Sequence, residues 1–240
     1  MSKTIVLTRP APQCATYADE LADMFGDRVA CTISPLLEIK PIDDMPDFTG
    51  VQAVLFTSAN GVRTLSKMQG VMPNIPCFCV GDKTAIEARS IGFEAFSAKG
   101  GADDLVHLAS TILSPENGPI LYISGKIAVG DIADKLSRHG FKIVEHVIYE
   151  QVPLSLTVEA KDMFASDSVD ILPMFSPMTA KLLAAELRAH PKWRLDKIDV
   201  ICLSSNVRKQ LHDLDFGSVT TVDTPTADAM SAEIGSLLRR

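Results

Sequence analysis

Short apolar runs alternate with amphipathic stretches along most of the chain, and this alternation constrains the fold more than any other feature of the sequence. Each run has the length of a buried strand and is rich in Val, Ile, Leu and Cys. The predicted strands are residues 4–8, 51–56, 77–80, 120–124, 143–147, 169–175 and 200–203. The stretches between them carry apolar residues at helical spacing. Strands that alternate with helices predict an α/β protein with parallel sheets and helices on both faces.

Capping residues predict where some of these helices begin. Asp82 and Thr84 are expected to cap the helix that follows the strand at 77–80. Gly101 and Asp103 are expected to open the helix that carries Leu105.

The chain contains an internal repeat, which indicates two similar α/β units. Residues 51–60 correspond to 169–178, and 75–81 correspond to 198–204. Two further segments, 35–41 and 146–153, are bordered by prolines and occupy matching places in the two repeats. Proline suits exposed edge strands, so we interpret both segments as a paired connector. A cleft between two similar units is a common place for a ligand.

Composition excludes several classes of protein. The chain has 240 residues, 46% hydrophobic and 22% charged, which is the mix of a globular protein with one large or two ordinary domains. The formal net charge of −7 argues against nucleic-acid binding. No segment has the pattern of a signal peptide or a membrane span. The five cysteines form no Cys-x-x-Cys pair, so we expect no metal site and a reducing, cytoplasmic compartment.

Several turns that follow predicted strands carry groups suited to binding an anion. Free N–H groups at a helix start, together with hydroxyl and amino groups, form carboxylate or phosphate sites. The candidates are Thr57, Ser58, Ala59, Asn60, Gly81, Lys83, Thr84, Gly101, Ser124, Gly125, Lys126, Ser176, Pro177 and Met178. Each turn alone is typical of ordinary helix capping or of a tight turn. Their shared place after strands favours one binding region, because ligands of open α/β sheets bind beyond the carboxyl ends of the strands.

The order of these segments resembles the uroporphyrinogen-III synthase family. The matching pieces are Leu7-Thr8-Arg9-Pro10, Phe56-Thr57-Ser58-Ala59-Asn60-Gly61-Val62, Cys79-Val80-Gly81-Asp82-Lys83-Thr84-Ala85, Ile148-Tyr149-Glu150 and Ser176-Pro177. The resemblance implies two flavodoxin-like domains joined by a two-stranded β connector, with a cleft between them. One domain would comprise 1–34 plus 154–240, the other 42–145, and the connector strands 35–41 and 146–153. The residues alone equally allow two sequential halves.

The resemblance also implies an activity, that of a hydro-lyase of haem biosynthesis. Its substrate would be hydroxymethylbilane, which it would close to uroporphyrinogen III with loss of water and inversion of the last pyrrole ring through a spiro intermediate. Tyr149 matches the family's tyrosine beside the connector and is the expected catalytic residue. Arg9 and Ser204 join the expected substrate-binding residues. No metal, cofactor or membrane is implied, and we expect a monomer that makes a transient contact with the preceding pathway enzyme.

Two features leave other functions open. Ser204 and Val207 stand where family members often have Gly and Thr. An acidic chain also suits a polyanionic substrate only if helix dipoles and local Arg9, Arg63, Lys83 and Lys126 offset its charge. The alternatives are a non-catalytic two-domain protein that binds a small anion, and a degenerate synthase homologue.

Overall fold

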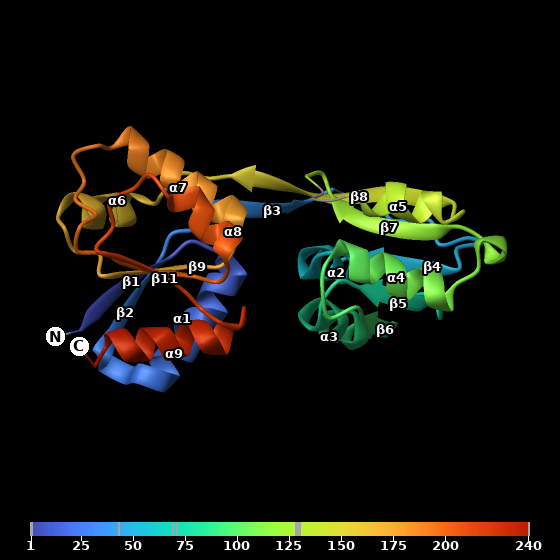
Figure 1. Cartoon of the computed structure of the whole chain (residues 1–240), viewed down its shortest axis with the longest axis horizontal. Coiled ribbons are helices and arrows are strands. Elements are labelled where there is room, and N and C mark those ends of the chain that lie inside the picture. The colour runs from blue at the N-terminus through green and yellow to red at the C-terminus, as the bar shows by residue number, and fades with distance from the viewer. Residues whose placement is uncertain (1, 43, 69, 71, 128–130, 240) are drawn as a thin grey trace. The chain divides into compact units, whose positions relative to one another are not determined.

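The computed structural model describes residues 2–42, 44–68, 70, 72–127 and 131–239. Within it the chain divides into two compact units (Figure 1). Unit 1 comprises Met1–Glu38 and Val152–Arg240, and unit 2 comprises Ile39–Gln151. Each unit is built on a sheet whose core strands are parallel, with helices packed on both faces. The predicted mixed α/β class is therefore confirmed.

Unit 1 has a five-stranded sheet with the order β11-β10-β9-β1-β2. Its strands are β1 (Lys3–Leu7), β2 (Val29–Ile33), β9 (Ile171–Met174), β10 (Asp199–Cys202) and β11 (Ser218–Thr221). Its helices are α1 (Ala11–Phe25), η1 (Gly26–Arg28), α6 (Val158–Ala165), α7 (Pro177–Ala189), α8 (Ser205–Arg208), η3 (Lys209–Leu211) and α9 (Ala227–Leu237).

Side-chain alternation along the strands divides the interior of unit 1 into two cores. Val6 faces a core formed with α6 and α7, whereas Ile5 and Leu7 face a core formed with α1 and α9. Figure 1 shows these two pairs of helices on opposite faces of the sheet. Packing fixes the register, because a shift by one residue would move each of these side chains into the opposite core.

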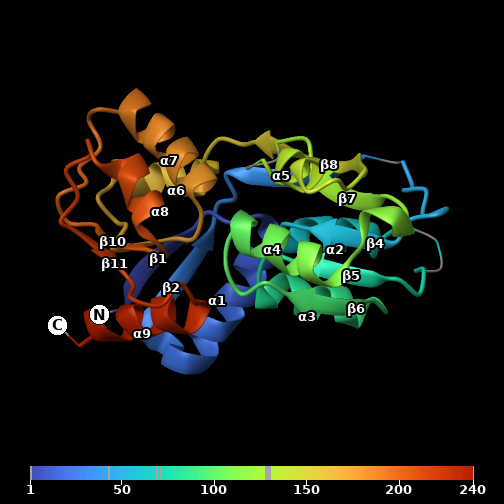
Figure 2. The same cartoon turned by 45° about the vertical axis from the view of Figure 1, so that its right-hand side comes forward.

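Unit 2 has a six-stranded sheet with the order β3-β8-β7-β4-β5-β6, which Figure 2 shows from β8 to β6. Its strands are β3 (Leu37–Pro41), β4 (Ala53–Phe56), β5 (Pro76–Cys79), β6 (Glu94–Ser97), β7 (Ile120–Gly125) and β8 (Ile143–Pro153). Its helices are α2 (Ala59–Leu65), α3 (Asp82–Ser90), α4 (Ala102–Ile112), η2 (Pro115–Asn117) and α5 (Ile132–Arg138). The helices α2 and α3 cover one face of the sheet, and α4 and α5 cover the other.

Three strands escaped the sequence prediction, and all three lie at the edge of a sheet. They are β2, β6 and β11. None of them is a continuous buried run, since β11 is half-buried throughout and β6 has one fully buried residue. A search for continuous apolar runs therefore finds the central strands and misses the edges.

The segment 143–153 differs from the prediction. We expected a buried strand at 143–147 and a separate edge strand within 146–153, but the structure has one continuous strand, β8. β8 lies between β3 and β7 and is therefore not an edge strand. β3 is an edge strand, as predicted. Pro153 is the last residue of β8, a position where its missing N–H interrupts no internal pairing.

The predicted caps of α3 are wrong, and at α4 the prediction is correct for Gly101, which is the N-cap, but not for Asp103. Gly81 is the N-cap of α3 and provides no side-chain hydrogen bond, while Asp82 is the first residue of the helix and Thr84 is buried. At α4, the N–H of Gly101 donates to the carboxylate of Asp104 at 2.6 Å, so Asp104 and not Asp103 supports that helix start.

Candidate active site

The predicted site residues that follow β4 and close β7 lie where the strand order of unit 2 reverses, whereas Gly81, Lys83 and Thr84 follow β5 and Gly101 follows β6. β5 and β6 follow β4 in the chain and lie on one side of it in the sheet. β7 and β8 come next in the chain and lie on the other side of β4. The turn after β4 begins with Thr57 and Ser58, and the parallel neighbour β7 ends at Gly125. Such a switch point is where open α/β sheets bind their ligands.

Tyr149 reaches this switch point because of an irregularity between β7 and β8. The register shifts at Ser124 and Gly125, so that Ser124 faces Val147 and Gly125 faces Tyr149. A methyl group on Gly125 would lie 2.5 Å from two ring carbons of Tyr149. The ring therefore occupies space that exists only because residue 125 is a glycine. The N–H of Lys126 also donates to the Tyr149 carbonyl at 2.8 Å.

Ser58 connects the start of α2 to the phenol of Tyr149. Its Oγ accepts the N–H of Asn60 at 3.2 Å, which caps the helix. The Ser58 side chain also acts on the phenol of Tyr149, whose pKa it lowers. The sequence predicts Ser58 as an anion ligand or an N-cap, and in the structure its side chain caps α2 and also lies beside a tyrosine.

Burial is the main reason why the pKa of Tyr149 is raised above its ordinary value of 10.0. The hydrogen bond with Ser58 lowers the pKa in part, and the nearby Tyr122 raises it. Tyr149 consequently keeps its proton at neutral pH. A raised folded-state pKa contributes stability below the unfolded value, and that contribution is lost as the pH rises through the folded-state pKa.

Tyr122 is a candidate that sequence reasoning missed. It lies within β7, is 4% exposed, and its hydroxyl is 3.3 Å from Oγ1 of Thr57. One feature of the sequence could have identified Tyr122 as a candidate. It lies three residues before Gly125, in a predicted strand that ends at a polar turn.

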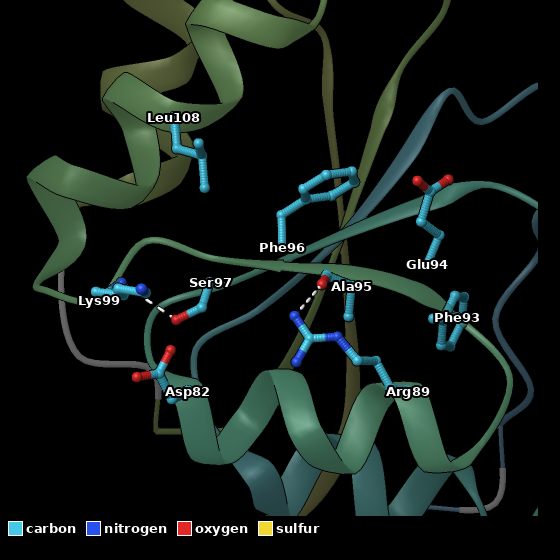
Figure 3. Close-up of a pocket in the computed structure, with 9 residues that line it drawn as sticks. All are labelled: Asp82, Arg89, Phe93, Glu94, Ala95, Phe96, Ser97, Lys99 and Leu108. Carbon is cyan, nitrogen blue, oxygen red and sulfur yellow. Dashed lines mark hydrogen bonds between the residues drawn. The ribbon is translucent and has the colours of Figure 1, made fainter.

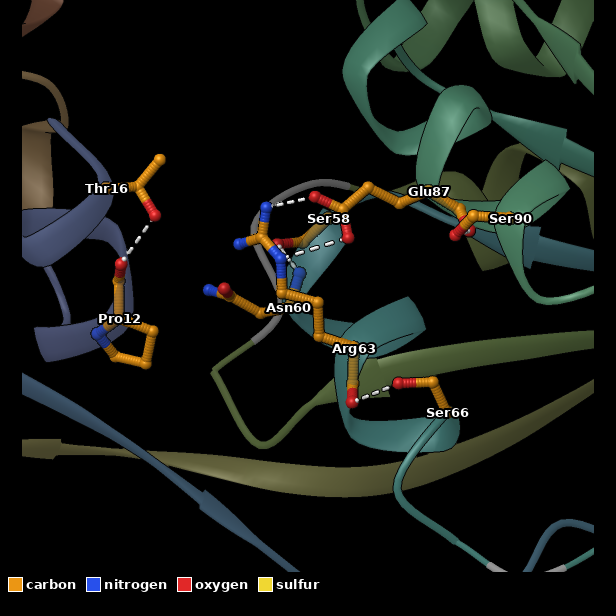
Figure 4. A network of polar contacts seen from close by, with 8 residues as sticks. All are labelled: Pro12, Thr16, Ser58, Asn60, Arg63, Ser66, Glu87 and Ser90. Carbon is orange, nitrogen blue, oxygen red and sulfur yellow. Dashed lines mark hydrogen bonds and ion pairs between the residues drawn. The ribbon is translucent and has the colours of Figure 1, made fainter. Parts of the chain in front are cut away.

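The charged residues near these turns are largely paired. Arg63 of α2 forms an ion pair with Glu87 of α3 (Figure 4), so its charge does not add to a positive site. Lys126 lies 3.3 Å from a carboxylate oxygen of Glu150. The N–H of Gly101 is already used by Asp104. At α3 the Gly81 N-cap supplies no side-chain acceptor, and Lys83 and Thr84 lie in the first turn.

A pocket of about 750 Å³ lies along the edge strand β6 and is separate from the predicted residues (Figure 3). Its charged lining residues, Asp82, Glu94, Arg89 and Lys99, balance one another. Arg89 donates to the carbonyl of Ala95, which covers part of the open strand edge. The pocket therefore has no excess positive charge to attract a polyanion.

The remaining predicted residues gather at the corresponding place in unit 1. Here the order reverses between β1 and β9, and Arg9 and Ser176 follow these two strands. The guanidinium carbon of Arg9 lies 4.2 Å from the centroid of the Phe175 ring. Ser176 accepts the N–H of Thr179 at 3.2 Å and thereby caps α7, whose first residues are Pro177 and Met178.

Ser204 lies after β10 and is the N-cap of the short helix α8, without a side-chain cap. Val207, which departs from the family pattern, is 1% exposed and belongs to the core beside α7.

Two properties concern only the part of the chain that the structure describes. No helix there is long and apolar enough to cross a bilayer. The same residues contain no group of three or more His, Cys, Asp or Glu side chains placed to hold a metal ion.

Parallel sheets with polar turns at both switch points define an α/β protein built to bind a small molecule. Comparisons with known proteins show which family this chain resembles. A family model described as uroporphyrinogen-III synthase HemD matches residues 21–232. A uroporphyrinogen-III synthase from Chlorobaculum parvum (strain DSM 263 / NCIMB 8327) is 30% identical over 195 residues, which cover 75% of this chain and 77% of the relative. The chain belongs to the uroporphyrinogen-III synthase family.

Solved structures support the fold. The crystal structure of uroporphyrinogen-III synthetase from Helicobacter pylori 26695 has a TM-score of 0.67 at 20% identity, and the match covers 99% of this chain and 100% of that one. A mutant uroporphyrinogen III synthase from the extremely thermophilic bacterium Thermus thermophilus has a TM-score of 0.58 at 14% identity, with 100% of both chains covered.

The contact between Gly125 and Tyr149 yields a prediction for Gly125→Ala. The φ of Gly125 lies outside the left-handed region, so the effect is steric. The added methyl group must displace the ring, and we expect a loss of about 1–3 kcal/mol in the free energy of unfolding, measured with urea. Gly81→Ala is the control, because nothing lies within 4 Å of its Cβ position, and it should cost about 0.5 kcal/mol or less. Equal losses in the two variants would contradict the packing described for Tyr149.

Proposed function

We infer that the chain is a uroporphyrinogen-III synthase, a lyase of tetrapyrrole and haem biosynthesis. The match of the HemD family model to residues 21–232 is the observation that carries this conclusion. The substrate is the small molecule hydroxymethylbilane. Loss of its terminal hydroxyl as water gives an azafulvenium cation, and the last pyrrole attacks this cation through its substituted carbon. The resulting spiro intermediate fragments and recombines with that ring inverted.

Tyr149 is proposed as the group that assists departure of the hydroxyl. A serine hydroxyl has one proton to donate and two lone pairs that accept. Since Ser58 already accepts from Asn60, its own proton can be donated to the phenol oxygen of Tyr149. This leaves the Tyr149 proton available for the leaving hydroxyl. The phenol is protonated at neutral pH and so has a proton to donate, while its raised pKa makes it a weaker acid than an exposed tyrosine.

The substrate carboxylates are proposed to bind at the turns that follow the strands. Thr57, Ser58, Ala59 and Asn60 stand after β4, and Ser124, Gly125 and Lys126 close β7. The start of α3 offers the helix N-terminus with Gly81, Lys83 and Thr84. In unit 1 the proposed residues are Arg9, Ser176, Pro177, Met178 and Ser204. We leave Gly101 out of the binding surface because its N–H is already paired with Asp104.

The domain organisation is a proposal of the same kind. We propose that each unit is a domain and that β3 and β8, which run across the unit boundary, are the two connector strands. The order of unit 1, β2-β1-β9-β10-β11, matches the flavodoxin order of 2-1-3-4-5 and supports a flavodoxin-like domain. The order in unit 2 differs from it, so we restrict that description to unit 1.

The cellular setting is also proposed. The five cysteines are free and four of them are buried, which supports the cytoplasm. We propose that the chain acts as a monomer. Because free hydroxymethylbilane closes spontaneously, a transient contact with the enzyme that produces it would shorten the exposure of the substrate.

Product analysis tests the proposed function. Hydroxymethylbilane is generated in situ, the purified chain is added, and the products are oxidised and separated as porphyrin isomers. We expect the type III isomer to predominate. Formation of the type I isomer alone, the product of spontaneous closure, would show that the chain is a binding protein or a degenerate homologue.

Tyr149→Phe tests the proposed acid. The substitution keeps the ring beside Gly125 and removes the proton donor. We expect kcat to fall by about 10–100-fold while type III product still forms, because the bilane ionises readily by itself. Single-turnover kinetics measures this step. An unchanged kcat would remove Tyr149 from the chemistry, and complete loss of type III product would show that the phenol does more than assist ionisation.

A further inference from the structure

Thr57 and Ser58 are adjacent in one turn, and each side chain interacts with a different tyrosine. Thr57 Oγ1 lies 3.3 Å from the hydroxyl of Tyr122, and the Ser58 side chain lowers the pKa of Tyr149. The two tyrosines belong to the neighbouring strands β7 and β8. The chain contains only three tyrosines, so two of the three hold this one turn.

The tyrosines approach the turn from opposite faces of the sheet. Leu55 belongs to the core with Tyr122, and Phe56 belongs to the core with Tyr149. Alternation along the strand continues into the turn, so that Thr57 follows the side of Leu55 and Ser58 that of Phe56. The turn is therefore fixed on both faces.

We propose that Tyr122 is a positioning residue of the active site, which holds the Thr57–Ser58 turn so that Ser58 orients the phenol of Tyr149. The inference rests on the proposed function and adds a residue to it. A phenylalanine would fill nearly the same buried space as Tyr122, so packing alone does not require its hydroxyl. The hydroxyl is accounted for by its bond to Thr57.

The proposed effect is transmitted through one peptide unit. Thr57 and Ser58 share that unit, so rotation of the Thr57 backbone also turns Ser58. Without the bond to Tyr122, the Thr57 end of this peptide unit can rotate. The Ser58 hydroxyl then moves relative to Tyr149. Displacements well below about 1 Å at a proton donor reduce the rate, because the transferring groups must be held within hydrogen-bonding distance.

A double-mutant cycle tests this coupling. Tyr122→Phe should lower kcat by about 3–10-fold and change KM by less than about 2-fold, since it disturbs orientation more than binding. In a Tyr149→Phe background, Tyr122→Phe should have no further effect, because the group it positions is absent. Thr57→Val removes the same bond from its other partner and should show the same lack of additivity with Tyr149→Phe.

Tyr17→Phe is the matched control. Tyr17 is also buried, and its hydroxyl is bonded to that of Ser231 at 3.0 Å, so the substitution removes one bond of the same kind in unit 1. It should change kcat no more than experimental error.

Three results would overturn the inference: a Tyr122→Phe variant with the kcat of the unaltered chain, effects of Tyr122→Phe and Tyr149→Phe that multiply, or an equal loss of kcat in Tyr17→Phe. If Tyr122→Phe does not fold, the Thr57→Val cycle decides in the same way. Failure of the proposed function is distinguishable, because the unaltered chain would then form no type III isomer.

Discussion

Parallel pairing of β4, β7 and β8 is the constraint on which the site in unit 2 depends. Parallel strands present their carboxyl ends at the same edge of the sheet, and here the ends of β4 and β7 carry Ser58 and Gly125, with Tyr149 of β8 opposite Gly125. The shift in register between β7 and β8 then decides which residue of β8 faces Gly125. Burial of the phenol follows from that placement and is the main cause of its raised pKa. One topological feature thus leads from the strand order to the protonation state of a side chain.

Much of this arrangement could be predicted from the sequence because it is local. Buried central strands are continuous apolar runs, and the turns that follow them carry hydroxyl and glycine residues at fixed offsets. The internal repeat correctly matched Ser58 with Ser176, each of which caps the helix after a strand. The edge strands β2, β6 and β11 were not predicted. Each pairs with a strand on one side only and is partly exposed, so its sequence is not a continuous apolar run.

The contacts that decide the chemistry were not predictable from the sequence, because they join residues far apart in the chain. The pair of Thr57 and Tyr122 depends on the register between β4 and β7. The ion pair of Arg63 with Glu87 removes a cation that appeared available. The bond from the N–H of Gly101 to Asp104, by contrast, joins residues three positions apart. The ion pair and the bond to Gly101 also affect how an acidic chain could bind an anionic substrate. With such groups neutralised, binding of a polycarboxylate relies on helix N-termini and a few cations, whose influence is short-ranged at ordinary salt.

The central claim is that burial keeps the phenol of Tyr149 protonated while the neighbouring Ser58 partly offsets this effect, and carbon-13 NMR of the tyrosine ζ-carbons tests it most directly. The three tyrosines give few signals, and Tyr149→Phe assigns the relevant one. The account predicts that Tyr149 titrates with a pKa above 10.0, and that Ser58→Ala raises this pKa further because the hydrogen bond that lowers it is lost. Ser231→Ala, which removes the partner of Tyr17, should leave the Tyr149 signal unchanged. A Tyr149 signal that titrates at its ordinary pKa and does not respond to Ser58→Ala would contradict the account.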